Sequence, residues 1–244
     1  MAPVIVARDL RKRYAGFAPV LRGVNLEVEP GELVAIMGPS GCGKSTMLNI
    51  LAGLWKADEG KVFVDDKAVN GVTDHFAYMP QSDLLLPWKT ILENVTLYGA
   101  LHHDRKHAEE EALKEFPRFG LEGYEKAYPA ELSGGMRQRA AFLRTALCSA
   151  DIMLLDEPFG ALDVITREDM QDWLLNLRSK LNRTTILVTH DVDEALYLSD
   201  RILILSHNPA SIAREIDLRG VAKSRAWLYN QIDLRREIYA LLRS

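Results

Sequence analysis

Cysteine and long apolar runs are both scarce in this sequence of 244 residues. Its two cysteines, Cys42 and Cys148, cannot build a disulfide framework, so we expect a reducing compartment such as the cytosol. No apolar stretch approaches the roughly 18 residues of a spanning helix, so another chain must cross any membrane at which the protein works. The apolar run at residues 3–7 is short and its positive charges follow it, unlike those of a secretory signal peptide.

An excess of basic residues is absent as well. The 30 Lys and Arg residues against 34 Asp and Glu give a formal net charge of −4, whereas a nucleic-acid-binding domain usually has a basic face. Hydrophobic residues make up 48% of the chain, which is ordinary for a globular protein. The length suits one large domain or a domain with an inserted subdomain. The composition therefore gives no support for nucleic acid as a partner.

Short apolar runs alternate with helical patterns along the chain. Residues 33–37, 152–155 and 185–188 are runs typical of strands that are buried on both faces of a parallel sheet. Further strands are predicted at residues 4–7, 26–28, 61–65, 76–79 and 201–205. This alternation predicts an α/β fold with a mainly parallel sheet, in which a ligand binds beyond the carboxyl ends of the strands.

A helical region interrupts the strands, because apolar residues recur at helical spacing between residues 136 and 147. We interpret the whole chain, 1–244, as a single domain with an insertion. Its predicted parts are the sheet core, residues 1–83 and 150–220, a helical subdomain, residues 84–149, and a C-terminal helix, residues 221–244. A regulatory or dimer contact by that C-terminal helix stays open.

Residues 38–45 fit the pattern G-x-x-x-x-G-K-[ST] between a predicted strand and a predicted helix, which is the context of a phosphate-binding loop. Its backbone N–H groups and the positive end of the following helix would face the phosphates. Lys44 would reach the β- and γ-phosphates, and the Ser45 hydroxyl would ligate Mg²⁺. The same helix end should favour the thiolate form of Cys42. The predicted nucleotide-binding residues of this loop are Gly38, Pro39, Ser40, Gly41, Cys42, Gly43, Lys44, Ser45 and Thr46.

Polar residues follow two of the buried runs. Asp156 ends the run at 152–155 and is placed to hold Mg²⁺ beside a triphosphate. The next carboxylate, Glu157, can orient and deprotonate an attacking water. His190 follows the run at 185–188. Because strand ends meet at one edge of such a sheet, we expect one site to contain these residues and the phosphate loop.

These motifs, in this order, resemble those of the ATP-binding subunit of ABC transporters over nearly the whole chain. Residues 132–139, Leu-Ser-Gly-Gly-Met-Arg-Gln-Arg, are similar to the family signature. Residues 152–158 look like the Walker B strand, and residues 160–163 look like the loop that follows it. The resemblance implies an α/β P-loop NTPase core with a mainly parallel sheet, N-terminal antiparallel strands and an inserted α-helical subdomain.

The resemblance also implies roles for individual residues, with ATP and Mg²⁺ as the ligands. The implied catalytic residues are Glu157, His190 and Lys44. The implied contacts to ATP outside the phosphate loop are Tyr14, which would stack on adenine, Gln81, Ser133, Gly135 and Asp163. The implied contacts to Mg²⁺ are Ser45, Gln81 and Asp156. In the family, the signature of one copy faces the nucleotide held by another, so we expect a head-to-tail dimer that closes on ATP.

The stretch from Gln81 to Trp88 is polar and then strongly apolar. Leu84 to Leu86 and Trp88 are too many exposed apolar groups for a free surface, which predicts a partner interface. Ordinary packing into the helical subdomain stays open for Trp88. The stretch is similar to one in importers of nitrate, taurine, sulfonates, bicarbonate and thiamine precursors. The resemblance implies a separate permease and substrate-binding protein, and a peripheral place on the cytoplasmic face of the membrane.

Three other functions remain as alternatives. A P-loop phosphotransferase would explain residues 38–45 but not the signature or His190. A non-transport ABC ATPase acting on DNA or ribosomes typically has two ATPase units or a long coiled-coil insertion, and this chain has neither. A nucleotide-sensing regulatory subunit would not need Glu157.

Overall fold

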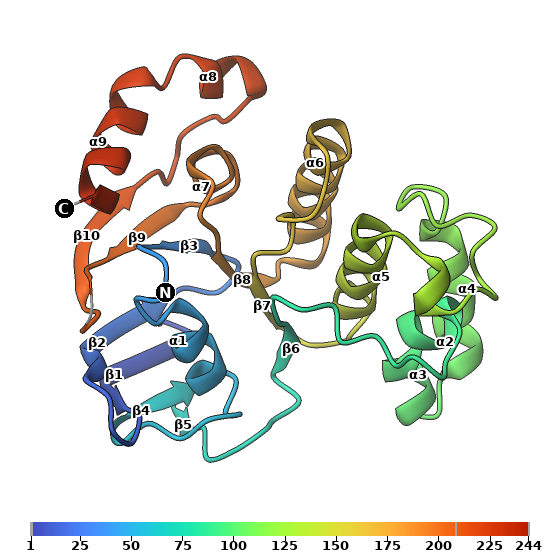
Figure 1. Ribbon diagram of the computed structural model, residues 1–244, viewed down its shortest axis with the longest axis horizontal. Coiled ribbons are helices and arrows are strands. Elements are labelled where there is room, and N and C mark those ends of the chain that lie inside the picture. The colour runs from blue at the N-terminus through green and yellow to red at the C-terminus, as the bar shows by residue number, and fades with distance from the viewer. Residues whose placement is uncertain (1, 208, 244) are drawn as a thin grey trace.

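Two β-sheets organise the structure, a computed structural model that describes residues 2–207 and 209–243 (Figure 1). The larger sheet has six strands in the order β10-β9-β3-β8-β7-β6. Its strands are β3 (Leu33–Met37), β6 (Phe76–Met79), β7 (Ile152–Asp156), β8 (Thr184–Val188), β9 (Arg201–Leu205) and β10 (Ile212–Asp217). Every neighbouring pair is parallel except β10 and β9. The prediction of a mainly parallel sheet is confirmed.

The smaller sheet is antiparallel and comes mostly from the N-terminal part of the chain. Its order is β2-β1-β4-β5, formed by β1 (Ile5–Arg13), β2 (Pro19–Val28), β4 (Glu59–Val64) and β5 (Lys67–Ala68). Strands β1 and β2 are longer than the apolar runs at 4–7 and 26–28 predict. Beyond those runs the two strands continue to pair with each other, but there buried apolar residues are mixed with exposed polar ones. The expected antiparallel N-terminal strands are therefore present.

The central strands are buried on both faces, as their composition predicts. All residues of β3, β7 and β8 are buried. On one face, helix α1 (Lys44–Leu51) lies between the two sheets and shares a hydrophobic cluster with both. On the other face, a second cluster joins the sheet to helices α5 (Gly134–Ala146), α6 (Val164–Leu181) and α7 (Val192–Leu198). This double cover fixes the strand ends at which the candidate site lies.

A group of helices is inserted between β6 and β7 and extends to one side of the sheets (Figure 1). It contains α2 (Ile91–Val95), α3 (Leu97–Leu101), α4 (Arg105–Glu115), a short 3₁₀ turn (Pro129–Glu131) and α5. With this insertion and the two sheets, the predicted fold class is confirmed. None of the helices in the described part of the chain is long and apolar enough to cross a membrane.

The C-terminal segment contains two helices where its apolar spacing predicts one. Helix α8 (Arg225–Tyr229) ends at Asn230, whose N–H bonds to the carbonyls of Trp227 and Leu228. Helix α9 (Ile232–Arg243) begins two residues later and packs Ile238 into the main core. Strand β10 was also not predicted, because its alternating residues are mostly exposed at the sheet edge.

Candidate functional site

A cavity of about 510 Å³ lies at the carboxyl ends of the central strands. The phosphate loop follows β3, Glu157 follows β7, and His190 follows β8. All three line the cavity, together with Tyr14 and Gln81. The structure thus brings together residues that are far apart in the sequence, as parallel strands with aligned ends require.

The phosphate loop depends on glycine at position 43. Gly43 has a φ of 114°, a conformation that side-chain-bearing residues rarely adopt, and a Cβ there would lie 2.7 Å from Val20 Cγ1. Lys44 begins α1, and its Nζ donates hydrogen bonds to the carbonyls of Gly38 (2.8 Å) and Pro39 (3.0 Å). The loop therefore wraps around its own lysine and directs the start of α1 at the cavity, which suits an anion.

The expectation that Cys42 is a thiolate is wrong. Its side chain is only 2% exposed, belongs to the hydrophobic cluster between the sheets, and does not line the cavity. Burial raises the pKa of the Cys42 thiol, and the nearby Lys44 offsets this only in part. Sequence position alone could not show that Cys42 turns away from the phosphates and into the core.

Asp156 and Ser45 together fit a divalent cation. Asp156 is buried at the end of β7, and burial raises the pKa of its carboxyl. The Ser45 hydroxyl is its hydrogen-bond partner and lowers that pKa. Ser45 also lines the cavity. A buried carboxylate paired with a hydroxyl beside a phosphate loop is the oxygen-rich environment that Mg²⁺ prefers, so these two residues fit the predicted ion.

Two polar side chains, those of Gln81 and His190, meet at the Glu157 carboxylate. The Glu157 carboxylate accepts a hydrogen bond from Gln81 Nε2 at 3.1 Å, and it lies 3.4 Å from His190 Nδ1. Glu157 has a φ of 51°, which is uncommon for a residue with a side chain. Its N–H bonds to the Val188 carbonyl at 2.9 Å, which ties this turn to the strand that precedes His190.

Tyr14 lines the same cavity. Its hydroxyl is 3.1 Å from Thr46 Oγ1, and its ring meets that of Trp55 edge to face at a centroid distance of 6.0 Å. An aromatic ring held at the mouth of a phosphate loop is placed where a planar base can stack.

The other predicted ATP contacts do not line this cavity. Ser133 caps α5 by accepting a hydrogen bond from the Met136 N–H at 3.3 Å, and Gly135 lies in the first turn of that helix. Asp163 caps α6 in the same way, with the Thr166 N–H at 3.0 Å. Ser133 and Asp163 are exposed. Both helix N-termini therefore lie outside this cavity, and their capping residues are exposed to solvent.

Two residues near the site were not predicted. Gln138 is buried in α5, and its Nε2 donates to the Glu157 carbonyl at 3.3 Å. Its position inside the signature motif, residues 132–139, is the sequence feature that could have marked it as a site residue. Arg167 on α6 donates a hydrogen bond, at 3.1 Å, to the carboxylate of Asp191, which is the residue directly after His190. No pattern in the sequence marks Arg167, because its partner lies on another element.

The apolar stretch near Gln81 is only partly exposed. Leu84 and Trp88 are 61% and 70% exposed, whereas Leu85 is buried in the main core, so the expectation that all these residues form a surface is wrong for Leu85. We call Leu84 and Trp88 the apolar pair. Helix α5 holds the backbone at the start of the pair, because Arg144 donates hydrogen bonds to the carbonyls of Asp83 (2.7 Å) and Leu84 (2.8 Å).

Known proteins resemble the chain over most of its length. The ABC transporter family matches residues 21–160. The formylaminopyrimidine import ATP-binding protein ThiZ of Halalkalibacterium halodurans is 43% identical over 235 residues, which cover 94% of this chain and 92% of that protein. The aliphatic sulfonates import ATP-binding protein SsuB 1 of Rhodococcus jostii is 44% identical over 221 residues, which cover 88% of this chain and 86% of that protein.

Solved structures agree with this relationship. The dimeric structure of MJ0796, a bacterial ABC transporter cassette, superposes with a TM-score of 0.80 at 34% identity and covers 88% of this chain and 99% of that one. A dimeric post-hydrolysis state of MJ0796 bound to ADP and Pi superposes with a TM-score of 0.78 at 33% identity over the same shares. Sequence, site geometry and fold lead to one conclusion: the chain belongs to the ABC transporter family, as one of its ATP-binding subunits.

Proposed function

We propose that the chain is the ATP-hydrolysing subunit of an ABC importer for a small molecule or anion. The observation that carries the proposal is the meeting of Gln81 and His190 at the Glu157 carboxylate, beside the phosphate loop. A nucleotide-binding protein that only senses ATP would not need a carboxylate held by two further polar groups at this place. A phosphotransferase would not need the open signature helix.

Each residue of the cavity has a physical task in this proposal. Lys44 and the N–H groups of its loop bind and orient the phosphates. Glu157 accepts a proton from the attacking water, while Gln81 and His190 fix the direction of its carboxylate. Ser45 and Asp156 would hold Mg²⁺, which would supply positive charge beside the phosphate oxygens. Tyr14 excludes water from one face of the base.

The proposed reaction needs two copies of the chain. Ser133, Gly135 and Asp163 lie at helix N-termini outside the cavity, where unpaired N–H groups and the positive end of the helix can meet a phosphate. A head-to-tail partner would place them against the nucleotide of the first copy. The dimeric form of MJ0796 supports this arrangement.

Transport would be carried by other chains. The apolar pair, Leu84 and Trp88, lies directly after Gln81 and suits contact with a permease on the cytoplasmic face of the membrane, with a substrate-binding protein as a further partner. The names of ThiZ and SsuB point to formylaminopyrimidine and aliphatic sulfonates as candidate substrates. Nitrate, taurine and bicarbonate remain candidates from the same resemblance.

Release of inorganic phosphate by the purified chain tests the catalytic part of the proposal. Glu157→Gln should lower kcat by about 100-fold or more, the usual size of a general-base contribution, while ATP still binds. Glu110→Gln, on an exposed part of α4, is the matched control and should leave both unchanged. Near-normal phosphate release by Glu157→Gln would contradict the assignment. Formation of ADP only when an acceptor is added, with the phosphoryl group on that acceptor and no inorganic phosphate released, would favour the phosphotransferase.

A further inference from the structure

The position of His190 is set by its backbone more than by contacts of its ring. Its side chain is 67% exposed. Helix α7 begins directly after it, with Asp191 as the N-terminal cap. A shift of the first turn of α7 would therefore move the imidazole relative to Glu157, which lies 3.4 Å away.

The first turn of α7 is rich in negative charge. The Asp191 carboxylate accepts hydrogen bonds from the N–H groups of Asp193 (2.8 Å) and Glu194 (3.2 Å). Thr189 Oγ1 donates to the Glu194 carboxylate at 2.6 Å and accepts from the Asp191 N–H at 3.0 Å. Three carboxylates thus lie within four consecutive residues. The positive end of the helix dipole stabilises them, whereas repulsion among them destabilises this turn.

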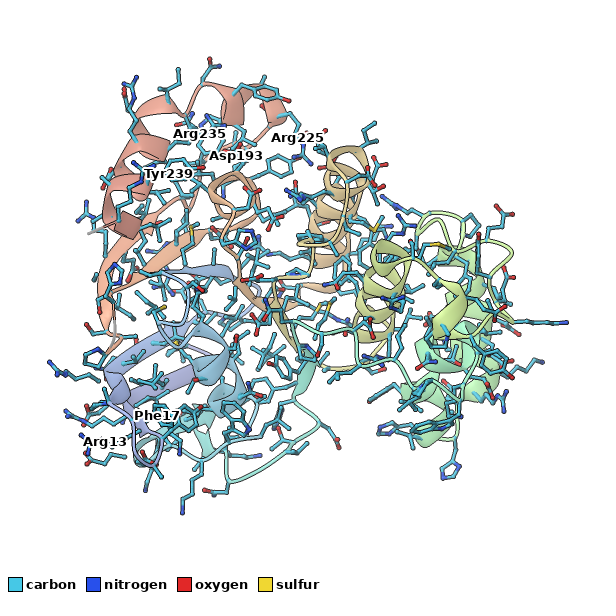
Figure 2. All side chains as sticks on the ribbon, in the orientation of Figure 1. Arg13, Phe17, Asp193, Arg225, Arg235 and Tyr239 are labelled. Atoms are coloured by element: carbon cyan, nitrogen blue, oxygen red, sulfur yellow. The ribbon has the colours of Figure 1, made fainter. Side chains whose placement is uncertain are left out.

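The C-terminal segment supplies a cation to this turn. Arg235 on α9 donates from Nε to the Asp193 carboxylate at 2.5 Å, and Figure 2 shows the two residues side by side between α9 and α7. The Arg235 side chain is only 20% exposed. Burial of Ile238 one turn further along α9 fixes the helix against the core that also contains α7. The pair is therefore held by packing as well as by charge.

A second arginine from the same segment holds the far end of α7. Arg225, labelled in Figure 2, stands at the start of α8. Its guanidinium carbon lies 3.9 Å from the centre of the Tyr197 ring. It also donates to the Asp172 carboxylate on α6 at 2.9 Å, and the Tyr197 hydroxyl donates to the same carboxylate at 2.8 Å. Helices α6 and α7 are therefore tied together through α8.

We propose that the C-terminal helices α8 and α9 position His190 for ATP hydrolysis, with Arg235 as the positioning residue that contacts the first turn of α7. The two arginines hold the two ends of α7, so the turn that begins at His190 cannot shift independently of the core. This inference rests on the proposed function, in which His190 acts on the reaction. It gives the C-terminal segment a role in catalysis although none of the residues described in that segment lines the cavity.

Steady-state ATPase kinetics of the full chain test the proposal. Removing one partly exposed ion pair in Arg235→Ala should lower kcat by about threefold to tenfold. The KM for ATP and the binding of a non-hydrolysable ATP analogue should stay unchanged, because the phosphate loop is untouched. Arg235→Lys should restore part of the loss. Arg236→Ala is the matched control, since Arg236 is 77% exposed and pairs within α9, and it should behave as the unchanged chain.

A double variant shows whether the effect passes through His190. If it does, Arg235→Ala should add no further loss of kcat in a His190→Ala chain. Full additivity, or a normal kcat in the folded single variant, overturns the proposal. If Arg235→Ala does not fold, Asp193→Asn breaks the same ion pair. This variant must then lower kcat and leave the KM for ATP unchanged. A normal kcat in His190→Ala would instead refute the role of His190 in the proposed function, so the two failures are distinguishable.

Discussion

Glu157 shows how one residue can receive its orientation from several parts of the chain. Its uncommon φ of 51° lies in a region of the backbone map that costs of the order of 1–3 kcal/mol. The N–H bond to Val188 and the bond from Gln138 to its carbonyl hold this conformation. The result is a carboxylate that points away from its strand and into the cavity, where Gln81 and His190 meet it.

Glu194 is a buried carboxyl at the first turn of α7. Burial raises the pKa of its carboxyl from 4.5 to about 7, while the Thr189 hydroxyl and Arg167 lower it in part. A carboxyl whose pKa is higher in the folded chain stabilises the fold fully below about pH 4.5. That contribution is lost as the pH rises through about 7.

Glu194→Gln should therefore reduce the pH dependence of stability. Between pH 5 and pH 8, the unchanged chain should lose on the order of 2 kcal/mol of unfolding free energy through this group. The variant lacks this contribution, so its unfolding free energy should fall by about 2 kcal/mol less over the same pH range. Urea unfolding of both chains at the two pH values measures the difference. Equal losses in the two chains would show that Glu194 does not titrate in this range.

Helix α5 links three features of the molecule at the scale of elements. Its N-terminus carries the signature residues, and its second turn contacts the Glu157 carbonyl through Gln138. Arg137, on the same helix, pairs with Asp83 at 3.1 Å, and Arg144 bonds to the next carbonyl, that of Leu84. A movement of α5 would therefore reach the catalytic turn and the apolar pair together.

The apolar pair should matter for complex formation and not for nucleotide binding. Replacing Trp88 by Ala removes a large exposed ring from the proposed permease contact. We expect Trp88→Ala to reduce recovery of the detergent-solubilised complex with the permease by about tenfold or more, while ATP binding to the isolated chain stays unchanged.

A second exposed apolar side chain provides the control for that measurement. Leu113 on α4 is 45% exposed but lies outside the apolar pair, so Leu113→Ala should leave recovery of the complex normal. Equal recovery with Trp88→Ala and with the unchanged chain would place the permease contact elsewhere.

At the scale of the whole molecule, the sequence predicts the centre better than the edges. Strands β3, β7 and β8 are continuous apolar runs because both of their faces are covered, and their ends carry the site. Strand β10 and the break between α8 and α9 lie at the periphery. Exposed polar residues there are compatible with more than one secondary structure, so the sequence does not predict these features. The inward turn of Cys42 and the pairing of Arg235 with Asp193 depend on contacts between distant segments, which no local pattern contains.

The central claim is that each ATP site is completed by a second copy of the chain. The phosphate loop lines the cavity, whereas Ser133 and Gly135 start a helix that does not. A chain that binds ATP but cannot hydrolyse it should therefore remain closed as a dimer. The signature should be needed for that dimer and not for binding the nucleotide.

The most direct test is the solution mass of the Glu157→Gln chain by light scattering, with and without ATP and Mg²⁺. We predict a change from 27.4 kDa to twice that mass when ATP is added. Adding Gly135→Arg to this variant should abolish the doubling while ATP still binds. A Glu157→Gln chain that stays at 27.4 kDa with ATP bound, or a dimer that persists with Gly135→Arg, would contradict the account.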